Sequence, residues 1–370
     1  MIHIAIIGRG MIGSAAARHL ARAGYQVTLI GPAEPNNKAI HGGVFGSHYD
    51  AGRITRALDP SLYWSDITRA SIARYTEIKA QSGIAFFTNC GSVMLGPQDS
   101  DFIRNVSHVQ KANAVACEKY SGADLKKALP FFRFERDSQV FYEEKGAGYI
   151  NPRKLVEAQS NAAMRAGATW VEATVLAITE NSGGVLVSTD KGEISADQVL
   201  VAAGGFTNMV LPQPVGFQNY ARTISFFEVS ENEAARLADM PTLVMEFVDG
   251  RDPYLLPPIR YPNGKMYLKL GCELADVPLN TLDELKAWFK GVGTAKIGAF
   301  QQAIMMEIMP DLRVEAIHTE ACMTTFSADD RPIITRQSDR ITVATAGCGR
   351  GAKCSDELGR MAAELCCKPA

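Results

Sequence analysis

The chain opens with the stretch His3-Ile4-Ala5-Ile6-Ile7-Gly8-Arg9-Gly10-Met11-Ile12-Gly13, an apolar run that leads directly into the pattern G-x-G-x-x-G. A buried strand followed by this pattern and a helix is typical of βαβ units that hold a dinucleotide pyrophosphate. Gly8 permits the tight turn, Gly10 lets backbone N–H groups approach the phosphates, and Gly13 lets the helix lie close to the strand. The positive end of the helix dipole faces the anion. The stretch therefore predicts dinucleotide contacts at Gly8, Gly10, Met11, Ile12 and Gly13.

The sequence that follows supports this prediction in one respect and departs from it in another. Residues 14–23 are small and helix-forming, and Gln26–Ile30 has the pattern of a second strand. In such units an Asp or Glu ends the second strand and binds the ribose hydroxyls. This chain has Gly31 at that position. Glu34 is a candidate replacement, and its alternative is a solvated loop residue.

Composition and charge favour a cytoplasmic enzyme and argue against several other classes. The 370 residues suffice for two domains, and a net charge of −2 with well-mixed signs gives no basic surface for nucleic acid or membrane. No apolar run reaches the roughly 20 residues of a transmembrane helix, and the early motif leaves no room for a signal peptide. The eight cysteines lack C-x-x-C spacing and the six histidines lack ligand spacing, so we expect reduced thiols and no metal site. A monomer or small homo-oligomer is expected.

Further segments are expected to return to the same nucleotide-binding sheet. Asn151-Pro152-Arg153 is typical of a helix start, with Asn as N-cap and Pro at the first helical position, and Gly167 is a typical C′ glycine. Two apolar runs are continuous, which indicates central strands covered on both faces, and the second enters a glycine-rich turn at residues 347–351. The expected strands cover residues 170–178, 184–189, 198–205 and 340–345.

This discontinuous layout favours a flavin enzyme over a nicotinamide dehydrogenase, whose nucleotide domain is usually contiguous. We expect an α/β fold in which a Rossmann-type FAD-binding domain with a β-meander is joined to a substrate domain. The substrate domain should be a mostly antiparallel sheet with helices, because residues 223–230 and 265–270 alternate like strands and residues 282–308 are amphipathic. The predicted FAD-binding domain comprises residues 1–85, 146–215 and 316–370, and the substrate domain residues 86–145 and 216–315.

Five segments carry a resemblance to a known family. They are SHYDAGRITR at residues 47–56, YARTISFFE at 220–228, MYLKLG at 266–271, ACMTT at 321–325 and AGCGRGAK at 346–353. In the same order along the chain, they resemble stretches of the monomeric sarcosine oxidase family, within the D-amino-acid oxidase superfamily. The last segment lacks one residue of that family's glycine turn.

The resemblance implies an FAD cofactor held covalently through Cys322, whose alternative role is that of a small buried hydrophobe. It also places Arg350 near the pyrimidine end of the flavin, where positive charge and backbone N–H groups favour an anionic reduced flavin. The other implied cofactor contacts are Ser47, Val175, Gly204, Gly349, Gly351 and Lys353.

The substrate is implied to be held by its carboxylate. Arg56 would bind that group with a bidentate fork and Lys353 with a point charge. The alternatives are a surface ion pair for Arg56 and a phosphate or helix-end contact for Lys353. Arg53 and His48 are implied to lie beside the flavin and the reacting centre, although His48 could equally be a structural histidine. Tyr49 replaces a second histidine of the family pattern and is assigned to the catalytic group with them.

Lys269 has the most specific implied role, which is to stabilise superoxide as reduced flavin passes electrons to O2. It lies between Leu268 and Leu270, where a buried lysine is costly without a purpose, although it could also point to solvent. Cys272 and Glu273 stand where the family has an aromatic residue and a histidine. Glu273 would present a carboxylate to the substrate and favour a basic or ammonium-bearing group, unless it is solvent-exposed.

The expected function is an FAD-dependent oxidase of an amino acid, with a secondary amine favoured, which oxidises a C–N bond to an imine and reduces O2 to H2O2. The first alternative is a flavin dehydrogenase that passes electrons to a quinone or a partner protein. A nicotinamide-dependent dehydrogenase and a flavin-binding scaffold without turnover are the others. The expected partners are a small-molecule amine or amino acid and O2.

Overall fold

The parallel sheet expected from the N-terminal motif is present in the computed structural model, which describes residues 1–135 and 137–368. Its strand order is β20-β21-β13-β1-β2-β9, and every neighbouring pair is parallel except the edge pair β20 and β21. The strands are β1 (His3–Ile7), β2 (Gln26–Ile30), β9 (Thr169–Val171), β13 (Gln198–Val201), β20 (Ile333–Arg336) and β21 (Ile341–Thr345).

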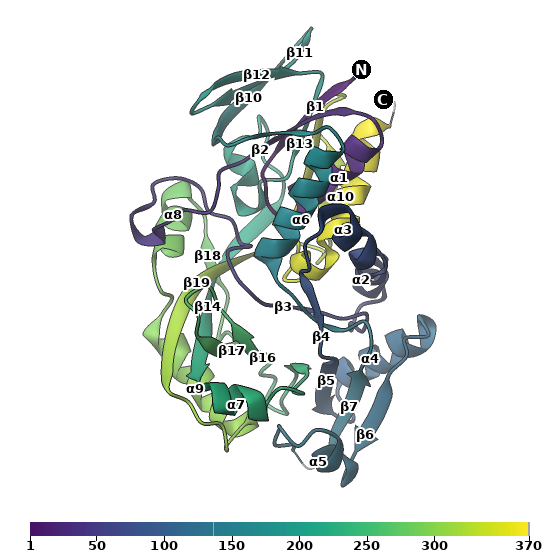
Figure 1. The fold of residues 1–370 in the computed structure, drawn as a ribbon, viewed down its shortest axis with the longest axis vertical. Coiled ribbons are helices and arrows are strands. Elements are labelled where there is room, and N and C mark those ends of the chain that lie inside the picture. The colour runs from purple at the N-terminus through teal and green to yellow at the C-terminus, as the bar shows by residue number, and fades with distance from the viewer. Residues whose placement is uncertain (136, 369–370) are drawn as a thin grey trace.

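Both faces of this sheet are covered, as its continuous apolar strands predict. Ile4 and Ile6 belong to a core with residues of the first and last helices, whereas Ala5 and Ile7 belong to a core with the β-meander. The helices on the first side are α1 (Met11–Arg22), α6 (Pro152–Arg165) and α10 (Gly351–Cys367), and the meander is β10 (Val175–Asn181), β11 (Gly184–Thr189) and β12 (Gly192–Ala196). Figure 1 shows this layered half at the end of the molecule where both termini lie.

The single strand expected over residues 170–178 is wrong, because this stretch forms two strands in different sheets. β9 ends at Val171 beside β2, and β10 starts at Val175 in the meander. Between them, the N–H of Thr174 donates to the side chain of Asp190 and its carbonyl accepts from the N–H of Asp190. These bonds tie Thr174 to the meander turn, so the chain leaves the parallel sheet there.

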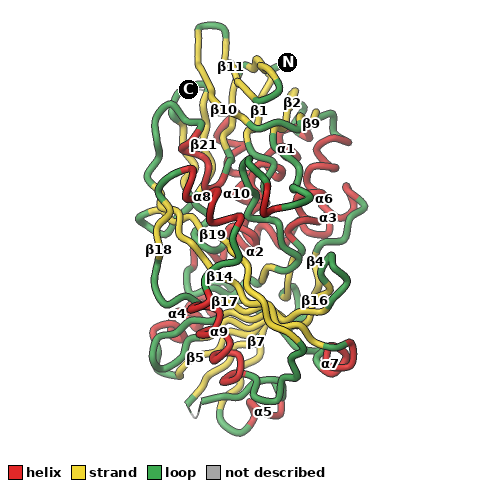
Figure 2. Tube along the Cα trace, turned by 90° about the vertical axis from the view of Figure 1, so that its left-hand side faces the viewer, coloured by secondary structure: helices red, strands yellow, loops and turns green. Residues whose placement is uncertain are grey.

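A larger sheet of nine strands forms the other half of the molecule. All of its pairings are antiparallel except that of β5 with β15, and the long strand β14 pairs with β17, β18 and β19. Figure 2 shows these strands crossing the molecule below the helices of the parallel sheet. The strands are β5 (Ser92–Pro97), β6 (Glu118–Ser121), β7 (Ser138–Glu143), β14 (Phe217–Val229), β15 (Thr242–Met245), β16 (Tyr254–Arg260), β17 (Met266–Gly271), β18 (Val277–Leu279) and β19 (Ala316–Ser327).

A small sheet of β3 (Arg53–Thr55), β8 (Gly148–Ile150) and β4 (Phe87–Asn89) completes the described β-structure, with β8 paired to both other strands. The remaining helices are α2 (Leu62–Ala73), α3 (Tyr75–Ser82), α4 (Asp101–Ala112), α5 (Asp124–Ala128), α7 (Glu231–Arg236), α8 (Leu282–Lys290) and α9 (Ala295–Ile308), with short 3-10 turns at Lys38–Ile40 and Gly204–Met209. Over residues 1–135 and 137–368, no helix is long and apolar enough to cross a bilayer.

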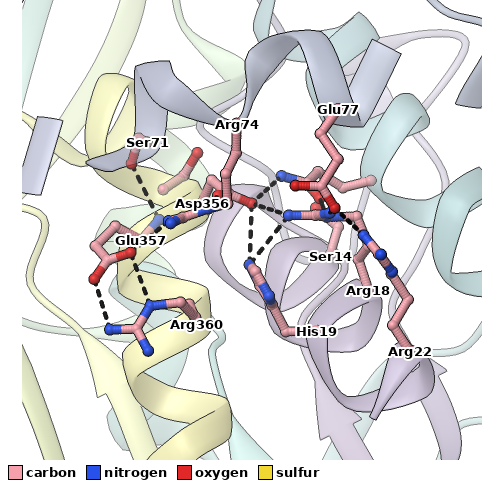
Figure 3. Close-up of polar contacts among 12 residues, drawn as sticks. Ser14, Arg18, His19, Arg22, Ser71, Arg74, Glu77, Asp356, Glu357 and Arg360 are labelled. Atoms are coloured by element: carbon pink, nitrogen blue, oxygen red, sulfur yellow. Dashed lines mark hydrogen bonds and ion pairs between the residues drawn. The ribbon is translucent and has the colours of Figure 1, made fainter. Parts of the chain in front are cut away.

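A buried polar network joins the helices around the N-terminal motif (Figure 3). Asp356 of α10 accepts hydrogen bonds from Arg18 of α1 at 2.8 Å and from Gln159 of α6 at 2.8 Å. Arg74, between α2 and α3, donates to the other carboxylate oxygen of Asp356 at 2.5 Å. Because Arg18 and Asp356 are almost fully buried, removing either one would deprive the other of an oppositely charged partner, which is costly. The network therefore fixes the last helix against the first.

Candidate functional site

The glycine pattern forms an open cradle at the start of α1. A Cβ on Gly8, whose φ is +106°, would lie 2.4 Å from the Ala202 carbonyl oxygen, and one on Gly13 would lie 1.9 Å from the Gly8 carbonyl oxygen. Neither position has room for a side chain. Gly10, by contrast, faces no atom within 4 Å and precedes a helix start without a side-chain cap. The free N–H groups of this helix end therefore face open space, as a phosphate site requires.

A cavity of about 950 Å³ extends from this cradle to the antiparallel sheet. Its volume is at the upper end of ligand sites, as a dinucleotide cofactor together with a small substrate requires. Of the cofactor contacts expected from the sequence, those lining it are Gly8, Gly10, Met11, Ile12, Ser47, Val175, Gly204, Cys322, Gly349, Arg350, Gly351 and Lys353. The expected substrate and catalytic residues that line it are His48, Tyr49, Arg53, Arg56 and Glu273. The lining of the cavity thus fits FAD at the end near the glycine cradle and a small ligand at the end near the antiparallel sheet.

The position usually taken by the ribose-binding carboxylate has no room for a side chain. A Cβ on Gly31 would lie 2.6 Å from the backbone nitrogen of Arg9. The guanidinium of Arg9 stacks on Trp170, 3.8 Å from the ring centroid, and the Trp170 indole N–H donates to the Gly31 carbonyl. Glu34 does not line the larger cavity. It pairs with Arg153 at 2.7 Å beside a second cavity of about 260 Å³.

Lys269 is fully buried and belongs to a closed ionic cluster around Asp50. Its ammonium donates to a carboxylate oxygen of Asp50 and to the Gly52 carbonyl, both at 2.5 Å. Arg53 lies 2.9 Å from the same carboxylate oxygen, and Tyr261 donates to the other oxygen at 2.9 Å. Burial alone would raise the pKa of Asp50, but Lys269 and Arg53 more than offset it and hold that pKa below its usual value.

Lys269 lines neither of the two cavities, so the cation that this cluster presents to both of them is Arg53. Burial lowers the pKa of Lys269, and Asp50 opposes that fall. Arg53 also donates to the thiol of Cys322 across 3.4 Å, and Cys322 lines both cavities. The indole of Trp288 anchors the Cys322 carbonyl at 2.6 Å. The sequence-predicted Arg53, Lys269 and Cys322 are therefore brought together: Asp50 links Lys269 to Arg53, and Arg53 contacts Cys322.

A second ionic cluster forms around Asp59, where β3 leads into α2. The Lys353 ammonium lies 2.7 Å from one oxygen of this buried carboxylate. Arg350 lies 3.5 Å and Arg56 lies 3.8 Å from the same oxygen. Arg56 and Lys353, which come from opposite ends of the chain, thus meet at the cavity wall, and Asp59 lies between them.

His48 and Tyr49 both line the larger cavity and both remain neutral at physiological pH. Burial and the nearby Arg9, Arg153 and Arg53 lower the pKa of His48 to about 3. Burial raises the pKa of Tyr49 to about 12, and its hydroxyl donates to the Ala33 carbonyl at 3.3 Å. A neutral imidazole keeps one nitrogen free to accept a hydrogen bond.

Glu273 is half-buried at the far wall of the larger cavity. One of its oxygens accepts the Thr223 N–H at 2.6 Å, and burial raises the pKa of its carboxyl. Nearby, Arg222 is paired with Asp276 at 2.6 Å. Part of the surface of Glu273 is therefore covered at the cavity wall, and part of it remains exposed.

Asp50 and Asp59 are the functional-site residues that the sequence reasoning missed. Asp50 lies inside the quoted stretch at residues 47–56, and Asp59 follows three residues after Arg56. A signal was present, because two arginines and two lysines assigned to a buried site need counter-ions. The nearest acids in sequence were the candidates for that role.

Comparison with known proteins identifies the class. A family model for FAD dependent oxidoreductases (DAO) matches residues 3–365, and the chain belongs to this family. It is 27% identical to an N-methyl-L-tryptophan oxidase of Yersinia pestis over 364 residues, which cover 97% of this chain and 93% of the relative. The chain is therefore an FAD-dependent oxidoreductase, and its predicted place beside the monomeric sarcosine oxidases is confirmed.

Solved structures agree on the fold. NikD, an amino acid oxidase of nikkomycin biosynthesis, superimposes with a TM-score of 0.79 at 19% identity, covering 100% of this chain and 95% of that protein. Amadoriase I of Aspergillus fumigatus, a fructosyl amine:oxygen oxidoreductase, gives a TM-score of 0.76 at 19% identity, covering 99% and 86% respectively. The predicted α/β architecture of two domains is confirmed.

Proposed function

We propose that this chain oxidises the C–N bond of an N-substituted amino acid to an imine and reduces O2 to H2O2. The observation that carries the proposal is the meeting of Arg56 and Lys353 at the wall of the same cavity that starts at the glycine cradle. A buried guanidinium and ammonium side by side are suited to a carboxylate. The relatives named as oxidases of an N-methyl amino acid and of amino acids support this substrate class.

The reaction balances with the groups named. The amino acid loses a hydride equivalent from carbon and a proton from nitrogen, and a C=N bond replaces the C–N bond. Water then adds to the imine, which separates into an amine and an oxo acid. FAD, when bound, supplies the two-electron acceptor that the side chains lack. O2 takes up two electrons and two protons and leaves as H2O2.

The residues of this chain bind, orient and hold protons. Arg56 and Lys353, which we call the carboxylate clamp, bind the substrate carboxylate and so hold the amine at a constant distance. Such positioning lowers the barrier substantially. His48 is neutral in the cavity wall, where its free ring nitrogen can accept a hydrogen bond from the substrate amine but, with a pKa of about 3, does not take its proton. Tyr49 keeps its own proton at neutral pH. Glu273 offers a carboxylate to a basic group at the far wall.

Covalent attachment of FAD through Cys322 is part of the proposal. It is supported by the position of Cys322 in the walls of both cavities and by its contact with Arg53. We expect flavin to stay with the polypeptide after acid precipitation, and intact mass to equal that of the chain plus one FAD. Cys322→Ser should release the flavin, whereas Cys354→Ser, at a buried thiol outside the cavity wall, should retain it. Release of free FAD from the unmodified protein would contradict this.

A dehydrogenase that passes electrons to a quinone or a partner protein is the second candidate. It is favoured by the pairing of Lys269 with Asp50, which neutralises the cation proposed to assist O2. Rapid aerobic H2O2 production, equal in amount to the substrate consumed, supports the oxidase. Slow reoxidation by O2 but fast reoxidation by a quinone supports the dehydrogenase.

The decisive experiment is a panel of amines and amino acids mixed anaerobically with the yellow protein. Bleaching of the flavin absorbance by N-methyl amino acids, and not by the matched amines that lack a carboxylate, is the expected result. The same compounds should fail to bleach an Arg56→Met variant at equal concentration. Bleaching by the amines alone would overturn the assignment of the clamp to a carboxylate.

A further inference from the structure

Asp59 contacts the cations of the clamp with a carboxylate oxygen that the local turn does not need. It lies in the turn Leu58-Asp59-Pro60-Ser61, is fully buried, and accepts the Ser61 N–H on one oxygen at 3.1 Å. That single bond would satisfy a turn residue. The other oxygen instead points to the ammonium of Lys353 at 2.7 Å, and the guanidinium groups of Arg56 and Arg350 lie within 4 Å of it.

The other acids near the clamp are already engaged. Glu143 of β7 accepts three backbone N–H bonds from Ala57 and Leu58 at 2.9–3.0 Å. Asp330 pairs with Arg350 at 3.0 Å on the exposed side of that guanidinium. Within residues 1–135 and 137–368, Asp59 is the one carboxylate in ion-pair distance of both Arg56 and Lys353.

Two cations buried side by side repel one another, so the clamp needs an anion even when no ligand is bound. Burial lowers the pKa of Lys353 and the adjacent Arg56 lowers it further, whereas Asp59 raises it. Burial alone would raise the pKa of Asp59, but Lys353, Arg56 and Arg350 hold it below its usual value. The remaining groups that face the ammonium are Glu143 and the thiol of Cys354.

We propose that Asp59 is the internal counter-ion of the clamp, a positioning residue that keeps Lys353 charged while the site is empty and restricts it to ligands with one negative charge. This inference rests on the proposed carboxylate clamp. With Asp59 in place, the pair Arg56 and Lys353 retains one positive charge for an incoming monocarboxylate. A second ligand carboxylate would meet the anion of Asp59 and be repelled.

The inference predicts a proton-linked change in binding. In Asp59→Asn, which keeps the acceptor for the Ser61 N–H, Lys353 of the empty clamp should lose its proton at a lower pH than in the unmodified protein, and above that pH it should regain the proton when an anion binds. Ligand binding should then take up roughly one proton, by linkage of binding to protonation. The unmodified protein should take up none, because Lys353 is charged throughout.

The test is calorimetric titration of the holoenzyme with acetate and with malonate, in two buffers of different ionisation enthalpy. We expect Asp59→Asn to bind acetate about tenfold more tightly at pH 6 than the unmodified protein, a factor that corresponds to one pKa unit of charge interaction. Affinity should fall as pH rises, and malonate should gain more than acetate. Asp66→Asn, which removes an exposed charge of α2 that lines neither cavity, should behave as the unmodified protein.

Three outcomes would overturn the inference in different ways. Unchanged affinity and no proton uptake in Asp59→Asn would show that Asp59 is not the counter-ion. Weaker binding at every pH without proton uptake would show a purely geometric role. Failure of the unmodified protein to bind acetate would reject the proposed clamp itself, and the inference with it. If Asp59→Asn does not fold, Asp59→Glu keeps the charge and should retain the zero proton count.

Discussion

Asp50 and Asp59 flank the same short strand, β3, and each holds a lysine and at least one arginine, yet the two clusters differ in what they leave available. The lysine of the Asp50 cluster is fully buried and lines neither cavity, whereas the lysine of the Asp59 cluster is in the cavity wall. Asp50 is further satisfied by Tyr261 and the Ala51 N–H. The donors of the closed Asp50 cluster are taken up by contacts within the protein. The open Asp59 cluster, in contrast, has donors in the cavity wall that can bind a ligand.

The comparison is tested most strongly by removing each carboxylate. Asp50→Ala removes the carboxylate that pairs with Lys269, and Lys269 has no solvent-facing surface at which water could replace it. The substitution should therefore lower the unfolding free energy by about 3–5 kcal/mol, as breaking a buried ion pair does. Asp59→Ala should cost less, because Lys353 and Arg56 face a cavity that water or an added carboxylate can fill. Thermal unfolding of both variants, with and without acetate, measures the difference. Equal losses would show that the clusters are energetically alike.

The second prediction concerns the lysine of the closed cluster. If its charge assists O2, Lys269→Met should slow reoxidation of the reduced flavin by about 10²–10³, as loss of one preorganised charge does. Anaerobic reduction by substrate should suffer much less, because it needs no such charge. Stopped-flow measurement of the two half-reactions separates these effects. Equal losses in both would assign Lys269 to holding Asp50 and Arg53 in place.

The third prediction concerns the open cluster. Arg56→Met or Lys353→Met should weaken acetate binding roughly tenfold to hundredfold, which corresponds to about 1.5–3 kcal/mol for a hydrogen bond to a charged group. The double variant should lose less than the sum, because both cations bind one anion. Titration of acetate into all three holoenzymes measures this. Binding like that of the unmodified protein in both single variants would place the clamp elsewhere.

The fourth prediction concerns acid stability. The pKa of His48 is about 3 in the folded protein and about 6.5 when unfolded, so the unfolded chain binds the extra proton first. Stability should therefore fall as pH drops from about 6.5 toward 3, and His48→Gln should flatten this part of the profile while leaving pH 8 unchanged. Asp59→Asn should flatten only the region below about pH 4. Unfolding midpoints between pH 3 and 8 distinguish the two.

Much of the fold was predictable because its deciding features are local. The G-x-G-x-x-G pattern, the N-cap at Asn151 and the continuous apolar strands each follow from short-range rules. The break between β9 and β10 was not predictable from such local rules, because it depends on hydrogen bonds between Thr174 and Asp190, which lies in a turn of the meander.

The candidate site was predictable in its cations and not in its anions. Motif resemblance pointed to Arg56, Lys269 and Lys353, because these residues stand within the stretches that resemble the family. Asp50 and Asp59 pair with those groups across the fold, and Lys269 reaches Asp50 from β17 of the nine-stranded sheet. Such pairings depend on how distant segments are placed in three dimensions, and no local sequence pattern in this chain predicts that placement.

The network around Asp356 has a consequence for how the protein is made. The cradle belongs to α1, near the beginning of the chain, but α1 is fixed through Arg18 to an acid on the last helix. While the ribosome is still extending the chain, that acid is missing, and Arg18 is a buried-to-be cation without its main partner. The packing of α1 is therefore completed only when α10, with Asp356 338 residues beyond Arg18, has been added to the chain. We expect flavin capture to require α10, so that a variant without this helix is colourless.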